Sequence, residues 1–138
     1  MVVCVGTDVH PLEMHHDGPM PLRVLLVDDD ARFRAVACRT LITEGVDVLA
    51  QVDNGRDAAA AVAQCRPDVV LLDIGLPDID GLEVARRLRT EEAGPVVILI
   101  STRDAAYGRR VARGLAAGYL PKDRLSLQAI LEIIPPQS

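Results

Sequence analysis

Aromatic residues are scarce in this sequence: two tyrosines, one phenylalanine and no tryptophan occur in 138 residues. Proteins that bind single-stranded nucleic acids stack bases on aromatic side chains, and proteins that bind duplexes present a basic face to the phosphates. The chain has too few aromatic residues for the first mode, and its formal net charge of −5 at pH 7 opposes the second. We therefore expect no direct binding to nucleic acid.

Cysteine is also scarce. Cys4, Cys38 and Cys65 form an odd, widely spaced set without a Cys-x-x-Cys pair, which favours reduced thiols in a cytoplasmic protein. The N-terminal residues lack the basic segment of a signal peptide and an apolar run long enough to span a membrane. These absences predict a cytoplasmic protein with no membrane partner.

The length of 138 residues suits a single domain, and 49% hydrophobic residues can supply one sizeable core. Residues 1–20 contain proline, glycine and three histidines without helical or strand periodicity, which predicts a flexible N-terminal extension. We place the folded domain at residues 21–135 and a short C-terminal tail at residues 136–138.

Short aliphatic runs alternate with amphipathic segments along this domain. Near-continuous apolar runs are typical of parallel strands covered on both faces, and they occur at 22–27, 46–52, 68–73, 95–101 and 118–121. The segments between and after them predict helices at 31–44, 55–65, 81–92, 104–116 and 125–134. Together they predict an α/β fold: a doubly wound, five-stranded parallel sheet with helices on both faces.

Polar residues follow the predicted strands at one edge of this sheet, where such folds bind their ligands. They are Asp28, Asp29, Asp30, Asp73, Ser101, Thr102 and Lys122. Aspartate, asparagine and serine are also ordinary turn and cap residues. We expect Asp30 to cap the first helix and Asn54 and Asp80 to cap the next two. Turn preferences explain any one residue of the set well, but the whole set poorly.

This set of side chains suits phosphoryl transfer to a carboxylate. Asp73 would be the nucleophile, and Asp28 and Asp29 would hold a divalent cation such as Mg²⁺, whose preferred ligands are oxygens. The cation would also supply the counter-charge that crowded aspartates after the first strand require. Ser101 would donate a hydrogen bond to a phosphoryl oxygen, and the ammonium of Lys122 would lie against that group as a point charge.

Over residues 22–134 the sequence resembles the receiver domain of two-component response regulators. The resemblance rests on an acidic pair after a hydrophobic strand, on Asp73 with the Asp-x-x-x-Pro and Asp-Gly elements of "LLDIGLPDIDGLEV", on Ser101 closing "VVILIS", and on Tyr119 and Lys122 in "GYLPK". Chance alone does not explain five such motifs in the same order.

The resemblance implies a flavodoxin-like sheet with strand order 2-1-3-4-5. It implies that Asp73 is the phospho-acceptor and that a sensor histidine kinase or a phosphotransfer protein is the donor. Mg²⁺ or Mn²⁺ would bind the carboxylates of Asp28, Asp29 and Asp73 and the backbone carbonyl of Gly75. Such a protein is no enzyme beyond phosphoryl transfer to and from its own aspartate.

Ser101 and Tyr119 would form a switch pair, in which the hydroxyl moves to the phosphoryl group and the ring rearranges. The sequence departs from the family near this pair. Thr102 replaces the usual small residue, and Arg103 places a long cation near the phosphoryl group, so both residues are candidates for tuning the lifetime of that group.

A second departure concerns the residues beside the lysine. Receivers commonly have a proline after this lysine with a cis peptide between them, whereas here Pro121 precedes Lys122 and Asp123 follows it. A cis bond after Lys122 is not expected, because cis bonds are essentially confined to proline. The isomer of the Leu120–Pro121 bond stays open.

The sequence ends at "IIPPQS" with no recognisable DNA-binding or catalytic module, so we expect a stand-alone receiver that acts through protein contacts. By the resemblance, the face of the fourth helix, fifth strand and last helix would bind a downstream effector or form a homodimer. The last helix, "LSLQAILEII", is rich in aliphatic residues. It either packs entirely in the core or adds an apolar patch to that face.

Two other classes of function stay open. A receiver-like interaction or dimerisation module without phosphorylation would keep the fold, although the complete set of acids, hydroxyl and lysine argues against it. An enzyme fits less well. A haloacid-dehalogenase-type phosphatase needs a second carboxylate where Gly75 stands, and a dinucleotide enzyme needs a glycine-rich turn where the first acids stand.

Overall fold

The computed structural model describes residues 21–76, 81–89, 94–102, 110, 112–113 and 116–134. The predicted N-terminal extension, most of the fourth predicted helix, Arg103, the Asp80 cap and the tail at 136–138 lie outside the described residues. Within the described part, none of the helices combines the length and apolarity that a membrane crossing requires.

The described strands form one parallel sheet in the order β2-β1-β3-β4-β5, the order that the resemblance to receiver domains implies. They are β1 (Arg23–Val27), β2 (Asp47–Val52), β3 (Val69–Asp73), β4 (Val96–Ser101) and β5 (Gly118–Pro121). The register aligns Val27 with Val52 on one side and with Leu72 on the other. The ends of β1, β2 and β3 therefore lie level, and the residues that follow them meet at one edge.

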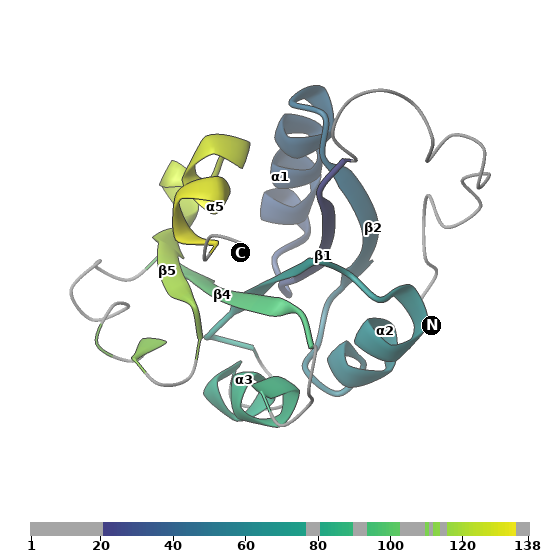
Figure 1. The fold of residues 1–138 in the computed structure, drawn as a ribbon, viewed down its shortest axis with the longest axis vertical. Helices are drawn as coiled ribbons and strands as arrows, with labels where there is room; N and C mark the ends of the chain where they lie inside the picture. The colour runs from purple at the N-terminus through teal and green to yellow at the C-terminus, as the bar shows by residue number, and fades with distance from the viewer. Residues whose placement is uncertain are drawn as a thin grey trace.

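Helices cover both faces of the sheet. Figure 1 shows α1 (Ala31–Thr43) and α5 (Leu127–Ile133) on one side, and α2 (Ala58–Cys65) and α3 (Gly81–Arg89) on the other. A short 3-10 turn, Lys122–Arg124, joins β5 to α5. This layered arrangement is the predicted doubly wound fold.

The core is aliphatic, as the shortage of aromatic residues requires, and it is divided by the sheet. Leu25 and Val27 pack with residues of α2 and α3, whereas Val24 and Leu26 pack with residues of α1 and α5. This alternation follows from the two-residue period of a strand. Because every β1 side chain from Val24 to Val27 is buried, the carboxylates after β1 start from a rigid base.

The ends of α1 agree with the local sequence. The Asp30 carboxylate accepts hydrogen bonds from the backbone amides of Arg32 and Phe33, which confirms the predicted N-cap. After α1, Gly45 has a φ of +93°, a left-handed conformation that glycine adopts without a Cβ penalty.

The start of α2 differs from the prediction. The helix begins at Ala58 rather than at residue 55, with Asp57 at the N-cap position. The Asn54 side chain instead accepts a hydrogen bond from the Asp57 amide at 2.8 Å. Asn54 therefore caps a turn before the helix, a role that asparagine fills as readily as a helix cap.

The apolar last helix is used mainly for core packing. Ile130 is completely buried, whereas Leu131 is 49% exposed. The other aliphatic residues of this segment are partly buried against the same cluster: Leu125, Leu127, Ile133 and Ile134. Leu131 is thus the strongly exposed aliphatic residue of the described part of α5.

The two described cysteines differ. Cys38 is a free thiol on α1, and burial raises its pKa. Cys65, at the end of α2, is disulfide-bonded. The prediction of reduced thiols is therefore wrong for Cys65, because spacing along the sequence does not report distance in the fold.

The contact between β5 and α5 generates a stability prediction. A Cβ at Gly118 would lie 2.7 Å from Cγ2 of Ile133, closer than van der Waals contact allows. We expect Gly118→Ala to reduce the free energy of unfolding by about 1–3 kcal/mol, the usual cost of overpacking. Urea denaturation would measure the loss. In an Ile133→Ala background, Gly118→Ala should cost little further stability, because the side chain that it overlaps is gone. Equal stability of Gly118→Ala and the unsubstituted protein would contradict the close approach.

Candidate functional site

Three carboxylates meet at the edge where β1 and β3 end. Asp28 is completely buried, Asp73 is 6% exposed, and Asp29 is exposed. One oxygen from each lies within 4.8 Å of the others, a spacing at which a single metal ion could contact all three. The structure thus brings together three of the residues that the sequence proposed as metal ligands.

Asp28 is held rigidly by its neighbours. Its amide donates to the carbonyl of Val52 at 2.9 Å, and its carbonyl accepts from Nη1 of Arg34 at 2.6 Å. Its Oδ1 accepts a hydrogen bond from the amide of Asp30 at 2.8 Å. The other oxygen, Oδ2, is buried and has no hydrogen-bond partner among the described residues.

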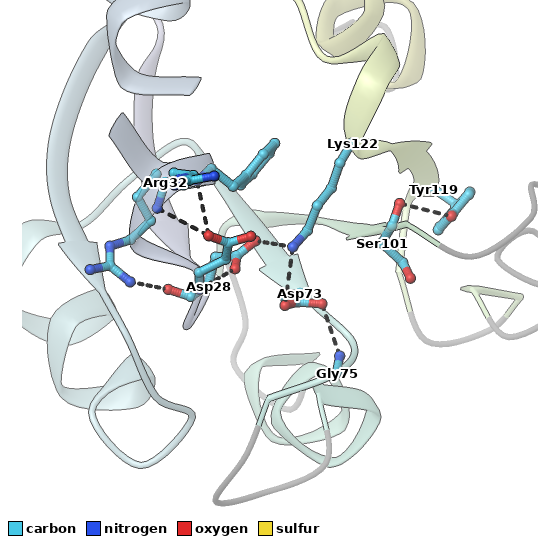
Figure 2. Close-up of polar contacts among 10 residues, drawn as sticks. Asp28, Arg32, Asp73, Gly75, Ser101, Tyr119 and Lys122 are labelled. Atoms are coloured by element: carbon cyan, nitrogen blue, oxygen red, sulfur yellow. Dashed lines mark hydrogen bonds and ion pairs between the residues drawn. The ribbon is translucent and has the colours of Figure 1, made fainter. Parts of the chain in front are cut away.

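Lys122 supplies a charge for that oxygen. Its Nζ lies 2.8 Å from Oδ2 of Asp28 and 3.4 Å from Oδ2 of Asp73. Figure 2 shows the side chain reaching from the segment after β5 to the two carboxylates. The contact with Asp28 has the distance of an ion pair without the angles of a hydrogen bond, whereas the longer contact with Asp73 is a hydrogen bond.

The electrostatics of this group reflect burial among like charges. Burial raises the pKa of Asp28, and Asp73 raises it further, although the ammonium of Lys122 and the amide of Asp30 oppose both effects. For Lys122, burial alone would lower the pKa, but the contact with Asp28 and the negative charges of both aspartates outweigh it and raise the pKa. Lys122 therefore stays an ammonium near neutral pH.

Asp73 is oriented by its own loop as well as by Lys122. Its Oδ1 accepts a hydrogen bond from the amide of Gly75 at 2.9 Å, and its Oδ2 faces Lys122. A Cβ at Gly75 would lie 3.5 Å from Oδ1 of Asp73, an ordinary contact. Gly75 is thus close enough to the carboxylate for its backbone to take part in the site.

The predicted switch residues are also neighbours. The hydroxyl of Tyr119 donates a hydrogen bond to the backbone carbonyl of Ser101 at 3.3 Å, and both residues are buried. In the sheet, Asp73 is aligned with Ile100, so Ser101 stands one position beyond it on β4. Thr102 follows as an exposed residue, and Arg103 lies outside the described residues.

The peptide bonds near Lys122 are ordinary. No cis bond occurs between described residues, so Leu120–Pro121 is trans, and the bond after Lys122 is trans as expected. Pro121 pairs with Ser101 at the end of the sheet, and Lys122 begins the following turn.

Sequence reasoning missed two residues of the site. Arg34 fixes the carbonyl of Asp28, and the ring centroid of Phe33 lies 4.7 Å from Nζ of Lys122. Both lie in the first part of α1, directly after the acidic turn. The amphipathic pattern of α1 assigned its apolar residues to the core and gave no sign of a contact with a residue 89 positions away.

These residues fit a hard divalent cation. Three carboxylates and one ammonium leave two negative charges uncompensated, and Oδ2 of Asp28 is a buried oxygen with no hydrogen-bond donor among the described residues. All the side-chain ligands are oxygens, which suit Mg²⁺ better than a soft transition metal. The acidic cluster is therefore a candidate Mg²⁺ site.

The fold and this cluster define a class of protein. The chain belongs to the response regulator receiver domain family, whose profile matches residues 24–134. Receiver domains are signalling modules of two-component systems; in general they bind Mg²⁺ at an acidic cluster and are phosphorylated on an aspartate.

Individual relatives agree with this assignment. The chain is 45% identical over 107 residues to the response regulator MprA of Mycolicibacterium vanbaalenii, a match that covers 75% of this chain and 45% of that protein. It is 39% identical over 99 residues to the DNA-binding response regulator MtrA of Mycobacterium leprae, covering 72% and 42%. The chain thus spans less than half the length of these curated relatives.

A solved structure is similar along almost its whole length. The signal receiver domain of the response regulator NarL from Mycobacterium tuberculosis superimposes with a TM-score of 0.74 at 34% identity, covering 83% of this chain and 96% of that one. The chemotaxis response regulator CheY4 of Vibrio cholerae, at 23% identity and a TM-score of 0.72, shares the fold.

The acidic cluster generates a prediction about metal binding. We expect Mg²⁺ to raise the melting temperature, because a ligand that binds only the folded state stabilises it by RT ln(1 + [L]/Kd), about 2.7 kcal/mol at 100 times Kd. The double variant Asp28→Asn, Asp29→Asn should lose this increment while keeping an acceptor for the Asp30 amide. NaCl at equal ionic strength is the control in thermal unfolding. An unchanged Mg²⁺ response in the double variant would contradict the site.

Proposed function

We propose that this chain is the phospho-acceptor receiver of a two-component system and that Asp73 is the residue phosphorylated. The observation that carries the proposal is the pairing of a buried carboxylate with a partly buried ammonium beside two further acids. Asp73 and Lys122 lie 3.4 Å apart, and Asp28 lies 2.8 Å from the same ammonium. A purely structural ion pair needs one acid for one base, whereas this group has three acids for one base where β1 and β3 end.

The proposed reaction is transfer of a phosphoryl group from a phosphohistidine of a sensor histidine kinase or phosphotransfer protein. A carboxylate oxygen of Asp73 forms a bond to phosphorus as the bond from phosphorus to the imidazole nitrogen breaks. The electron pair of the broken bond remains on that nitrogen, which can then bind a proton. The hydrogen bond from Gly75 and the contact with Lys122 orient the carboxylate for this attack.

The positive groups at the site would oppose the charge brought by the phosphoryl group. A phosphoryl group carries about −1.5 to −2 charge near neutral pH, and Lys122 is already within contact distance of Asp73. A bound Mg²⁺ or Mn²⁺ would neutralise developing negative charge on the transferred oxygens. Asp28, Asp29, Asp73 and the Gly75 carbonyl would hold the cation.

Ser101 and Tyr119 would convert phosphorylation into a change at the surface. The Ser101 hydroxyl would move to a phosphoryl oxygen, and its backbone carbonyl already accepts the hydrogen bond of Tyr119. A displacement of Ser101 therefore changes the contact that holds the tyrosine ring. Thr102 and Arg103, the two residues that follow Ser101 in the sequence, would tune the lifetime of the phosphoryl group.

The wider assignments belong to the same proposal. The receiver would occupy residues 21–135 and act in the cytoplasm, with no membrane partner and no direct contact between this domain and nucleic acid. Its output would be a contact with a downstream effector, or a homodimer, through the face of the fourth helix, β5 and α5. It would transfer phosphoryl groups only to and from its own aspartate.

The acceptor assignment is tested by intact mass. After incubation with Mg²⁺ and acetyl phosphate, the unsubstituted protein should gain the mass of one phosphoryl group. Asp73→Asn should gain none, because an amide is nearly isosteric with a carboxylate but a poor nucleophile. Asp53→Asn, at an exposed aspartate after β2, is the matched control and should be labelled normally.

Other outcomes of this experiment would count against the proposal. Labelling that persists in Asp73→Asn would place the acceptor elsewhere. A folded, unsubstituted protein that binds Mg²⁺ but never gains the adduct would favour the receiver-like interaction module instead.

The switch assignment is tested with beryllofluoride, a mimic of the phosphoryl group, and Mg²⁺. We expect amide NMR shifts around Asp73 and also along residues 101–122, because a two-state element needs only a small bias to change which state dominates. Ser101→Ala should keep phosphorylation but lose most of the distant shifts. Thr43→Ala, which removes an exposed hydroxyl from α1, should leave them intact. Shifts confined to the acidic cluster would overturn the switch.

A further inference from the structure

Phe33 holds a position that the proposed reaction does not explain. Its ring centroid lies 4.7 Å from Nζ of Lys122, within the distance at which an ammonium is attracted to an aromatic face. The ring is half-buried in the first turn of α1 and packs against the cluster beneath α1 and α5. The two residues come from opposite ends of the domain, so this contact exists only in the folded state.

The surroundings of Lys122 make the ring contact effective. The side chain of Lys122 is 12% exposed, and an attraction between a cation and a ring increases as water is removed. Both the ring and Asp28 belong to the junction of β1 and α1. They act on the ammonium from one side of the site, and Nζ is correspondingly closer to Asp28, at 2.8 Å, than to Asp73, at 3.4 Å.

The partners on that side cannot easily follow the ammonium. Asp28 is fixed through its amide, its carbonyl and Oδ1, and the amide of Phe33 is bonded to the Asp30 cap at 3.2 Å. Any redistribution of contacts between Asp28 and Asp73 must therefore come from movement of the Lys122 side chain. The contacts that hold the Lys122 ammonium beside Asp28 therefore determine how readily its side chain moves toward Asp73.

We propose that Phe33 is a positioning residue whose ring holds the Lys122 ammonium against Asp28 and thereby weakens binding of a divalent cation at Asp28. The ammonium lies against Oδ2, the buried oxygen without a hydrogen-bond donor among the described residues. A cation that takes this oxygen must displace the ammonium or repel it. Because the ring stabilises the ammonium in this position, a higher concentration of the cation is needed to occupy the site. The inference rests on the proposed function only in taking Asp28 as a cation ligand.

The test compares Mg²⁺ affinity in variants of the full chain. Phe33→Leu removes the ring but keeps an apolar side chain, and Phe33→Tyr keeps the ring face. We expect the Kd for Mg²⁺, followed by amide NMR titration, to fall about threefold to tenfold in Phe33→Leu, given the usual strength of a partly desolvated cation–ring contact. The Kd should stay near the original value in Phe33→Tyr. Ile42→Ala, an exposed substitution on the same helix, controls for general effects on α1.

A double-mutant cycle separates positioning from a merely structural role. In a Lys122→Gln background the ring has no ammonium to hold, so Phe33→Leu should leave the Kd for Mg²⁺ unchanged. A direct signature is the upfield ring-current shift of the Lys122 ε protons, which should disappear in Phe33→Leu and remain in Phe33→Tyr.

The outcomes distinguish this inference from the function on which it rests. A Kd that does not fall in Phe33→Leu, or that falls equally in the Lys122→Gln background, would overturn the role of Phe33. Mg²⁺ binding by the unsubstituted protein would in both cases leave the acidic site standing. Failure of the unsubstituted protein to bind Mg²⁺ would overturn the cation site, and with it the inference.

Discussion

The ion pair of Lys122 with Asp28 and Asp73 is the contact on which the site depends. Burying carboxylates is costly unless a positive group lies beside them, and here one ammonium serves two acids at 2.8 and 3.4 Å. The sheet order makes this possible, since β1 and β3 are adjacent and the turn after β5 carries Lys122 over their ends. Three segments distant in the sequence are thereby tied together at one edge.

The same ammonium also leaves the site able to change. It compensates one negative charge of three, and the remaining excess suits a divalent cation at Asp28 and Asp29 or a redistribution of contacts around Asp73. Phe33 and Arg34 each contact one member of the ion pair between Lys122 and Asp28. The ring of Phe33 lies against the ammonium, and the guanidinium of Arg34 fixes the backbone carbonyl of Asp28. A firmly held acid beside a base that contacts two carboxylates fits the proposed response to a phosphoryl group.

Much of the fold could be predicted, because buried parallel strands have near-continuous apolar sequences. The predicted strands differ from the observed ones by at most one residue at their starts, and the Asp30 cap is confirmed. The start of α2 was predicted too early, since Asn54 stabilises a turn as well as a helix. The prediction of a reduced thiol is wrong for Cys65, which is disulfide-bonded. The separation of cysteines along the sequence does not report the distance between their sulfur atoms in the fold.

The sequence by itself determined which side chains reach the edge of the sheet. A strand in a doubly wound sheet delivers the residue after its last apolar position to that edge, so Asp28, Asp73 and Ser101 could be placed from periodicity alone. Only the tertiary structure decided which of them touch. The counter-charge that crowding requires was assigned to a cation, yet in the fold Lys122 lies against Asp28, and Phe33 lies against Lys122. Such contacts depend on helix packing and side-chain direction, which join residues far apart in the chain and leave no periodic trace in its sequence.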